Sequence, residues 1–197
     1  MEKVSNQVLL DTAVQLMSTS GKSLKKIATG TRAMKYELVD GRTVRVRTCN
    51  DHVLVVLATS TDADAKLNIE GTDFLLVVMP EVPRKEGPVV AYLLPTAVAV
   101  KEVRIAHMEW LNSGPATRGN NLTWNIWFDE GPPGCSGFAK RWAAYLLPKA
   151  NTATSELKTV NEKETGSLGG VIAKARSQIA TAAGVPLDAV KITVVLD

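Results

Sequence analysis

The stretch YELVDGRTVRVRT, residues 36–48, decides the fold. Two short runs alternate apolar and polar residues, and Asp40-Gly41 stands between them. An Asp-Gly pair between alternating runs is a strong signal for a tight turn, because glycine adopts the positive φ that such a turn needs. The stretch therefore predicts a β-hairpin whose second strand carries Arg45 and Arg47 on one face.

The segments around the hairpin predict a mixed sheet flanked by helices. Residues 4–18 place apolar side chains at helical spacing, and Thr96 is expected to cap a second helix that ends near Gly114. Three apolar runs predict further strands, at residues 52–58, 73–80 and 88–95. Such continuous runs are typical of strands that are covered on both faces. The expected fold class is α/β (α+β), with a mixed central sheet.

The remaining elements are less regular. The second helix presents large apolar residues that predict its buried side, namely Val100, Val103, Ile105, Met108 and Leu111. Residues 121–128 predict another strand, and residues 135–147 predict a second short helix. Residues 149–166 carry few large hydrophobic residues. They predict a linker between a core of residues 1–148 and a C-terminal helix–strand unit of residues 167–197.

Composition excludes several classes of protein. Hydrophobic residues make up 45% and charged residues 22%, the balance of a globular protein with a buried core. No apolar run reaches the roughly 18–20 residues that a membrane span requires. Cys49 and Cys135 lie far apart, as do His52 and His107, so neither a disulfide framework nor a clustered zinc site is indicated. These features favour a cytoplasmic protein, and we read the N-terminus as mature sequence.

Positive charge is concentrated near the hairpin. Residues 21–48 contain eight cations, opposed only by Glu37 and Asp40: Lys22, Lys25, Lys26, Arg32, Lys35, Arg42, Arg45 and Arg47. A local excess of this size suits a polyanionic partner. The competing interpretation is an ordinary solvated basic face.

Three segments resemble a known nuclease core. YELVDGRTVRVRT (36–48), KLNIEGTDFLLVVMP (66–80) and PVVAYLLPTAVAV (88–100) together look like the restriction-endonuclease-like core of the PD-(D/E)xK superfamily. The resemblance covers about residues 5–112. It implies a mixed sheet between helices and a metal-dependent site. Glu37 then stands at the position of the family's first metal-binding acid.

The sequence departs from that family where its chemistry lies. Arg45 stands at the position of the second acid and Arg47 at that of the family's lysine. Two carboxylates would have to converge on Mg²⁺, and a guanidinium, which keeps its charge near neutral pH, opposes that. The resemblance therefore implies a degenerate site with no catalytic residue and no cofactor. If the protein is an active nuclease, Glu37, Asp40, Glu70 and Asp73 are the candidate acids, and Mg²⁺ is the cofactor.

The same residues suggest that phosphate is held rather than cut. Guanidinium groups grip phosphate oxygens in pairs, although Arg45 and Arg47 could instead pair with Glu37 across the hairpin. In the strand predicted at residues 121–128, tryptophan and asparagine side chains are candidates for base contact, although at least one of Trp124 and Trp127 is expected in the core. The predicted nucleic-acid-binding residues are Lys25, Lys26, Arg32, Arg42, Arg45, Arg47, Arg118, Trp124 and Asn125.

Three functional hypotheses follow. The first is a non-catalytic DNA-binding protein, with double-stranded DNA as the favoured partner. The second is a divergent metal-dependent nuclease, and the third is a protein-interaction or immunity-type module. A Cys49–His52 nucleophile is not favoured, because nearness in sequence does not supply the required geometry. No membrane partner is expected, and a homodimer is one option for the oligomeric state.

Overall fold

The computed structural model describes residues 3–27, 34–115 and 121–151. The chain divides into two compact units, Met1–Ala153 and Thr154–Asp197. The predicted C-terminal unit and all but the first three residues of the predicted linker lie outside the described residues. Within the described part of the chain, none of the helices is long and apolar enough to cross a membrane.

The described elements alternate in an order that is typical of an α+β protein. In chain order they are α1 (Asn6–Thr19), β1 (Leu24–Lys26), β2 (Lys35–Leu38), β3 (Thr43–Thr48), β4 (Val53–Leu57), β5 (Phe74–Pro80), β6 (Pro88–Pro95), α2 (Thr96–Asn112), β7 (Thr123–Trp127), α3 (Phe138–Arg141), η2 (Ala143–Tyr145, a 3₁₀ turn) and β8 (Ala150–Asn151).

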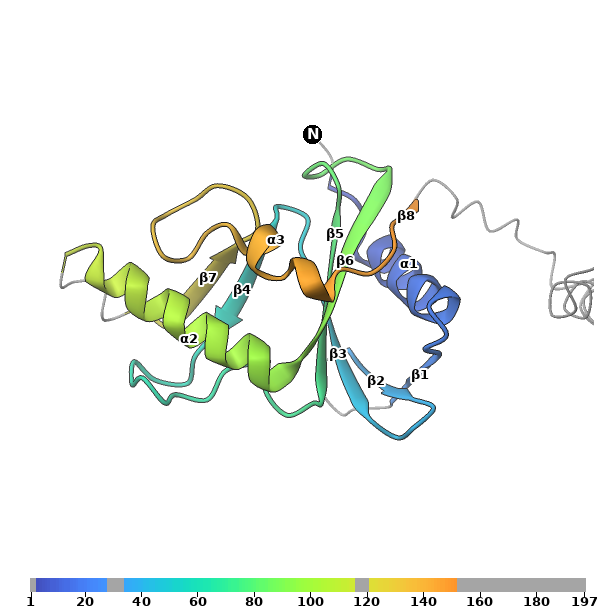
Figure 1. Ribbon diagram of the computed structural model, residues 1–197, viewed down its shortest axis with the longest axis horizontal. Coiled ribbons are helices and arrows are strands. Elements are labelled where there is room, and N and C mark those ends of the chain that lie inside the picture. The colour runs from blue at the N-terminus through green and yellow to red at the C-terminus, as the bar shows by residue number, and fades with distance from the viewer. Residues whose placement is uncertain (1–2, 28–33, 116–120, 152–197) are drawn as a thin grey trace, which may run out of the picture. The chain divides into compact units, whose positions relative to one another are not determined.

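The strands form a main sheet and a separate pair (Figure 1). The main sheet has six strands in the order β1-β2-β3-β5-β6-β8, and β8 contributes only two residues. β3 and β5 are parallel, and every other neighbouring pair in this sheet is antiparallel. β4 and β7 form the separate antiparallel pair. These observations confirm the mixed sheet of the predicted fold class.

The predicted hairpin is confirmed and defines one part of the main sheet. β2 and β3 pair with Lys35 opposite Arg45 and Glu37 opposite Thr43. Gly41 has a φ of +82°, a left-handed conformation that glycine adopts without a steric penalty. The turn closes with a hydrogen bond of 2.8 Å from the backbone N–H of Leu38 to the carbonyl oxygen of Arg42.

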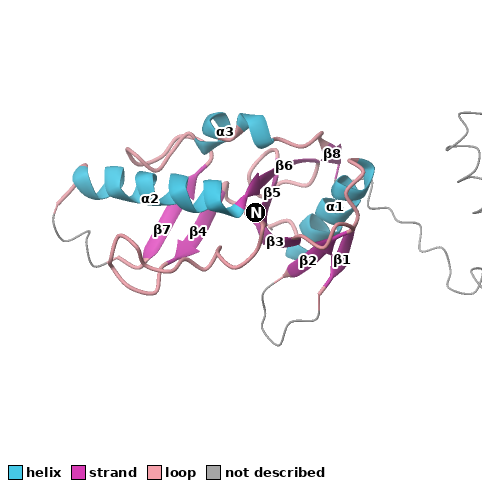
Figure 2. Ribbon diagram, turned by 60° about the horizontal axis from the view of Figure 1, so that its bottom comes forward, coloured by secondary structure: helices cyan, strands magenta, loops and turns pink. Residues whose placement is uncertain are grey.

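Two hydrophobic clusters lie on opposite faces of the main sheet. Leu9, Leu16 and Met17 of α1 pack against one face, which includes Val44 and Leu76. On the other face, Leu75 and Val77 of β5 pack in a cluster with residues of α2, β4, β7 and α3. Figure 2 shows α2 running alongside β4 and β7. β5 is covered on both faces, as its apolar run predicts.

The first expectation that proved wrong concerns β4. Its apolar run predicts a strand covered on both faces, but burial alternates, and Val55 and Leu57 are 41% and 49% exposed. The reason is its partner: β4 pairs only with β7 among the described strands, and one face of that pair stays open. An apolar run alone does not distinguish a central strand from a half-exposed one.

The buried side of α2 also differs from the prediction. Ala99, Val103, Ala106 and His107 are buried. Ile105 and Met108, which were predicted to be buried, are 39% and 43% exposed. Small alanine side chains allow close packing of a helix, so the positions of the larger residues do not decide which side of α2 is buried. Thr96, which was expected to cap this helix, is its first helical residue, and the cap is Pro95 without a side-chain hydrogen bond.

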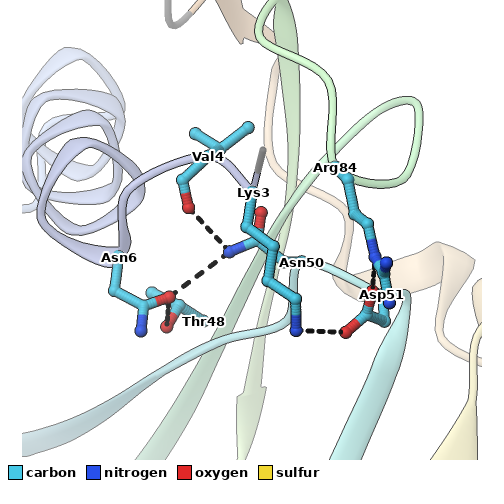
Figure 3. Close-up of polar contacts among 7 residues, drawn as sticks. All are labelled: Lys3, Val4, Asn6, Thr48, Asn50, Asp51 and Arg84. Atoms are coloured by element: carbon cyan, nitrogen blue, oxygen red, sulfur yellow. Dashed lines mark hydrogen bonds and ion pairs between the residues drawn. The ribbon is translucent and has the colours of Figure 1, made fainter. Parts of the chain in front are cut away.

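Polar contacts fasten the start of α1 to the ends of β3 and β5 (Figure 3). Asn50 donates 2.8 Å to the carbonyl oxygen of Val4, and Thr48 donates 3.1 Å to Asn6. Asp51 binds Lys3 at 3.0 Å and also accepts a hydrogen bond from Arg84. These contacts fix the orientation of α1 against the sheet that it covers.

Candidate nucleic-acid interface

Arg45 lies on the face of β3 opposite α1 and is bound to backbone. Its Nη1 donates 2.6 Å to the carbonyl oxygen of Asn68, and its Nη2 donates 3.1 Å to that of Glu70. Its Nε is buried without a hydrogen-bond partner. Burial, followed by the charge of Arg47, lowers the pKa of this guanidinium. Two of its donor groups are therefore directed at the chain itself.

Arg47 lies two residues along on the same face and makes a similar contact. Its Nη2 donates 2.7 Å to the carbonyl oxygen of Val55 in β4. The alternative in which the arginines pair with Glu37 across the hairpin is not what the structure shows, since Lys35 stands opposite Arg45. Both arginines instead attach β3 to the β4 region.

A third arginine, on α2, also donates hydrogen bonds to backbone carbonyl oxygens. Arg104 of α2 donates to the carbonyl oxygens of Ala63 and Ala65, the latter at 2.8 Å, and binds Glu70 Oε1 at 3.2 Å. Arg45 and Arg104 thus both satisfy backbone carbonyls of the long connection between β4 and β5. Such carbonyls are costly to leave without donors when they are partly buried.

The four candidate acids of the nuclease hypothesis are engaged separately. Asp40 forms an exposed ion pair with Arg42 at 2.5 Å, which lowers the pKa of its carboxyl. Asp73 accepts hydrogen bonds from the backbone and hydroxyl of Thr43 at 2.7 and 2.9 Å, and these lower its pKa.

The other two candidate acids also contact different groups. Glu70 accepts 3.0 Å from the backbone N–H of Leu67 and binds Arg104, while Glu37 stands between Lys25 and Thr43 in the sheet. In the described part of the chain, no group of three His, Cys, Asp or Glu side chains is arranged to hold a metal ion.

Cys49 and His52 do not form a nucleophile and base. Cys49 is buried, and that burial raises the pKa of its thiol to about 12. His52 instead places Nδ1 2.7 Å from Asp129 and Nε2 2.5 Å from the carbonyl oxygen of Pro80. Both neighbours are acceptors, so only the doubly protonated ring donates to both of them. The contacts join the turn after β3 to β5 and to the segment after β7.

The exposed cations lie at the edge of the main sheet. Lys22, Lys25 and Lys26 are exposed and form no ion pair with a described residue. Lys25 lies opposite Glu37 in β2. Figure 1 shows α1 beside β1–β3, and no other described helix covers that part of the sheet.

The face of β1–β3 that points away from α1 is therefore polar. Tyr36 and Val44 belong to the cluster under α1, so their neighbours along each strand point the opposite way. These neighbours are Lys25, Lys35, Glu37, Thr43, Arg45 and Arg47. We call this surface the basic sheet face, and we include in it two exposed lysines of the same sheet edge: Lys22, which precedes β1, and Lys26, which stands opposite Tyr36 and therefore points to the α1 side of that edge. Among these strand residues Glu37 is the single acid, and the carboxylate of Asp73 contacts Thr43 at the margin of the face.

The predicted base-contacting residues lie elsewhere, on β7. Trp124 is buried in the core at 2% exposure, and its ring stacks on His107 at a centroid distance of 4.0 Å. Asn125 follows it and lines a small cavity together with Trp127. Sequence reasoning missed His107 and Trp110, which line the same cavity from α2, because their spacing on a helix resembles ordinary core packing.

Two predicted cations lie outside the described residues. Arg32 falls within residues 28–33, and Arg118 falls within residues 116–120. Arg42, the last of the predicted set, lies at the hairpin turn with its guanidinium 4.8 Å from the centre of the Phe74 ring. The structure thus groups the described cations of the predicted set, Lys25, Lys26, Arg42, Arg45 and Arg47, around β1–β3. Trp124 and Asn125 lie on β7, and Arg47 bonds to Val55, which pairs with Asn125.

Comparison with models of known protein families, with curated proteins and with solved structures finds no match for this chain.

Proposed function

We propose that this protein binds nucleic acid without cutting it, and that the basic sheet face contacts the phosphate backbone. The observation that carries the proposal is the group of exposed lysines, Lys22, Lys25 and Lys26, which have no ion-pair partner among the described residues. Lysines without acidic partners keep their attraction for phosphate, and each one that binds releases a counterion.

The shape of the region supports double-stranded DNA as the partner. β2 and β3 are inner strands of the main sheet, and the hairpin turn that joins them is exposed, with Val39 at 89% exposure. This turn can face the major groove of B-DNA, which is about 12 Å wide. The lysines beside and within β1 would then reach the phosphates that border the groove.

The arginines have a different role in this proposal from the one that the sequence suggested. Arg45 and Arg47 direct guanidinium donors at carbonyl oxygens of Asn68, Glu70 and Val55. They hold the face in shape, and the lysines provide the phosphate contacts. We further propose that the frame is a degenerate restriction-endonuclease-like core. The mixed sheet, the hairpin and the helices on both faces support it, as does the separate engagement of the candidate acids.

Fluorescence anisotropy with a labelled DNA duplex tests the proposal. The variant Lys22→Ala/Lys25→Ala/Lys26→Ala should bind at least tenfold more weakly than the parent at about 0.1 M salt. The matched control is Lys66→Ala/Lys85→Ala/Lys101→Ala, which removes three exposed lysines elsewhere and so changes the net charge equally. The control should bind within about twofold of the parent.

Three results would overturn the proposal. Equal loss of affinity in both triple variants would mean that net charge, not the basic sheet face, attracts DNA. Cleavage of a plasmid in Mg²⁺ or Mn²⁺ that is lost on mutating Glu37 or Asp73 would instead support the nuclease hypothesis. A parent protein that binds no nucleic acid at low salt would remove the proposal altogether and favour a protein-interaction module.

A further inference from the structure

Among the described strands, β7 pairs only with β4, and a cavity of about 130 Å³ follows its other edge. In Figure 2, β7 lies on the outer side of this pair, farther from the main sheet than β4. All five residues of the strand, Thr123–Trp127, line the cavity. Successive side chains of a strand point to opposite faces, so a cavity that touches every residue runs along the backbone of β7. His107 and Trp110 of α2 contribute to its wall.

Hydrogen bonds at the two ends of β7 show which of its residues bond to β4. The carbonyl oxygen of Leu122 accepts 2.9 Å from the backbone N–H of Ala58, which follows β4. The backbone N–H of Phe128 donates 2.9 Å to the carbonyl oxygen of His52, which precedes β4. In an antiparallel pair, residues that bond to the partner strand alternate with residues that point away from it. Every second residue from 122 to 128 therefore bonds to β4.

The residues between them point their N–H and C=O groups away from β4, toward the cavity. Two of these N–H groups already have acceptors. That of Trp127 donates 2.8 Å to the carbonyl oxygen of Cys135, and that of Thr123 donates 2.8 Å to the side chain of Asn121. Three groups have no hydrogen-bond partner among the described residues: the N–H and C=O of Asn125 and the C=O of Thr123. We call these three groups the β7 edge.

An open row of backbone donors and acceptors can pair with a further strand. A residue placed opposite Asn125 would exchange two hydrogen bonds with it, and the C=O of Thr123 would accept a third. Charged residues and proline commonly prevent such pairing at the edge of a sheet. β1, at one edge of the main sheet, carries Lys25 and Lys26, whereas β7 (TWNIW) contains neither a charge nor a proline.

The wall formed by α2 suits one apolar side chain of an added strand. Trp124 points to the face on which α2 lies, and its ring stacks on His107 at 4.0 Å. The neighbours of a residue opposite Asn125 would point to this same face. Burial lowers the pKa of His107, so its imidazole is uncharged at neutral pH. A cavity of about 150 Å³ in another protein holds one benzene molecule, so about 130 Å³ has room for one side chain of similar size.

We propose that the β7 edge binds an extended peptide segment of a partner protein by strand addition, with one uncharged apolar side chain in the cavity beside α2. The backbone groups of Asn125 and Thr123 provide the hydrogen bonds, and the cavity selects the side chain. The inference does not rest on the basic sheet face, which is built from other strands.

Amide hydrogen exchange of the full chain, followed by NMR, tests the proposal. The probe is a capped heptapeptide of threonines with leucine at its centre. In the free protein the amide of Asn125 should exchange faster than those of Trp124 and Ile126, which bond to β4. With the peptide at ten times its dissociation constant, exchange at Asn125 should slow about tenfold. A peptide with phenylalanine at the centre should also bind, and one with aspartate should bind at least tenfold more weakly.

Backbone methylation of the peptide separates strand addition from simple burial of the leucine. If the leucine enters the cavity, the N–H groups of its two neighbouring threonines face β7 and its own N–H faces away. Methylating the nitrogens of those two threonines should weaken binding at least tenfold. Methylating the leucine nitrogen is the matched control and should change binding less than threefold.

A pair of proline variants assigns the binding to the β7 edge. Asn125→Pro removes the N–H that faces the cavity and leaves the bonds to β4 in place, and proline is tolerated at such edge positions. It should weaken peptide binding about tenfold. The control is Val55→Pro, because Val55 stands opposite Asn125 and its N–H points away from β7. The control should bind within about twofold of the parent.

Several results would overturn the proposal. They are slow exchange at Asn125 in the free protein, no binding of the leucine or phenylalanine peptide up to about 1 mM, or equal effects of the two methylation patterns. Protection of Asn125 that rises with protein concentration in the absence of peptide would assign the edge to a second copy of the chain and also contradict it. If Asn125→Pro fails to fold, the methylated peptides decide alone.

Discussion

Replacing Arg45 with alanine should destabilise the fold more than it weakens DNA binding. The guanidinium donates to the carbonyl oxygens of Asn68 and Glu70 at 2.6 and 3.1 Å. Removing it leaves two carbonyls of the connection between β4 and β5 without their donor. Hydrogen bonds from charged donors contribute about 1.5–3 kcal/mol each. Arg45 is only partly buried, so water can replace part of this, and we expect a loss of about 2–3 kcal/mol in total.

Thermal unfolding followed by circular dichroism measures this loss. For a unit of about 150 residues, each kcal/mol corresponds to about 2–4 °C in Tm, so Arg45→Ala should lower Tm by about 5–10 °C. Arg42→Ala is the matched control, since it removes the same charge from the same hairpin. The guanidinium of Arg42 bonds to the exposed Asp40, and its removal should leave Tm nearly unchanged.

DNA affinity provides the opposing measurement. At a temperature well below its Tm, Arg45→Ala should bind a duplex within about twofold of the parent, because the lysines provide the phosphate contacts. An unchanged Tm together with a large loss of affinity would refute the structural role of Arg45. It would return this residue to the phosphate-binding role that the sequence suggested.

Three further predictions concern the titration of Cys49, the titration of Asp51 and the packing of α2. Burial raises the pKa of the Cys49 thiol to about 12, so its contribution to stability is complete below about pH 9 and is lost as the pH rises toward about 12. In urea denaturation, the stability of Cys49→Ala should therefore fall less steeply above pH 9 than that of the parent. The hydrogen bond from Arg84 lowers the pKa of Asp51, so Asp51→Asn should be less stable than the parent near pH 7, and in the same assay the difference should shrink as the pH falls below the ordinary aspartate value of 3.8. Ala99→Leu should cost about 1–3 kcal/mol by overpacking, whereas Ile105→Gln should leave Tm within about 1 °C, and the reverse order would contradict the observed face of α2.

Local features of the fold were predictable where one short-range effect decides them. Asp40-Gly41 between alternating runs specifies the hairpin, and the structure has it at that position. The continuous apolar run of β5 predicts a strand covered on both faces, and it is. The helical spacing of Leu9 and Leu16 likewise predicts α1. In each case the pattern and the local backbone preference agree.

Features that depend on distant partners were not predictable. The run of β4 is as apolar as that of β5, but β4 pairs with β7 and leaves Val55 exposed. The buried side of α2 includes the small residues Ala99 and Ala106, and the positions of the large apolar residues of the helix do not predict that side. The contacts of Arg45 lie 23 and 25 residues along the chain, so its sequence neighbours could not reveal them.

The positive charge of the candidate site was predictable from the sequence, but which of its cations are available to a partner was not. A cluster of cations around residues 21–48 is visible in the sequence. Which of them remain available to a partner depends on β4, which accepts from Arg47, and on the connection between β4 and β5, which accepts from Arg45. Lys22, Lys25 and Lys26 stay exposed.

The salt dependence of duplex binding tests the central claim most directly. Neutralised phosphates contribute a slope of about −0.9 each to a plot of log affinity against log salt concentration. If Lys22, Lys25 and Lys26 each neutralise one phosphate, replacing all three with alanine should reduce the magnitude of that slope by about 2.7. The control triple variant at Lys66, Lys85 and Lys101 should keep the slope of the parent. Equal slopes in the parent and the Lys22/Lys25/Lys26 variant would contradict the account.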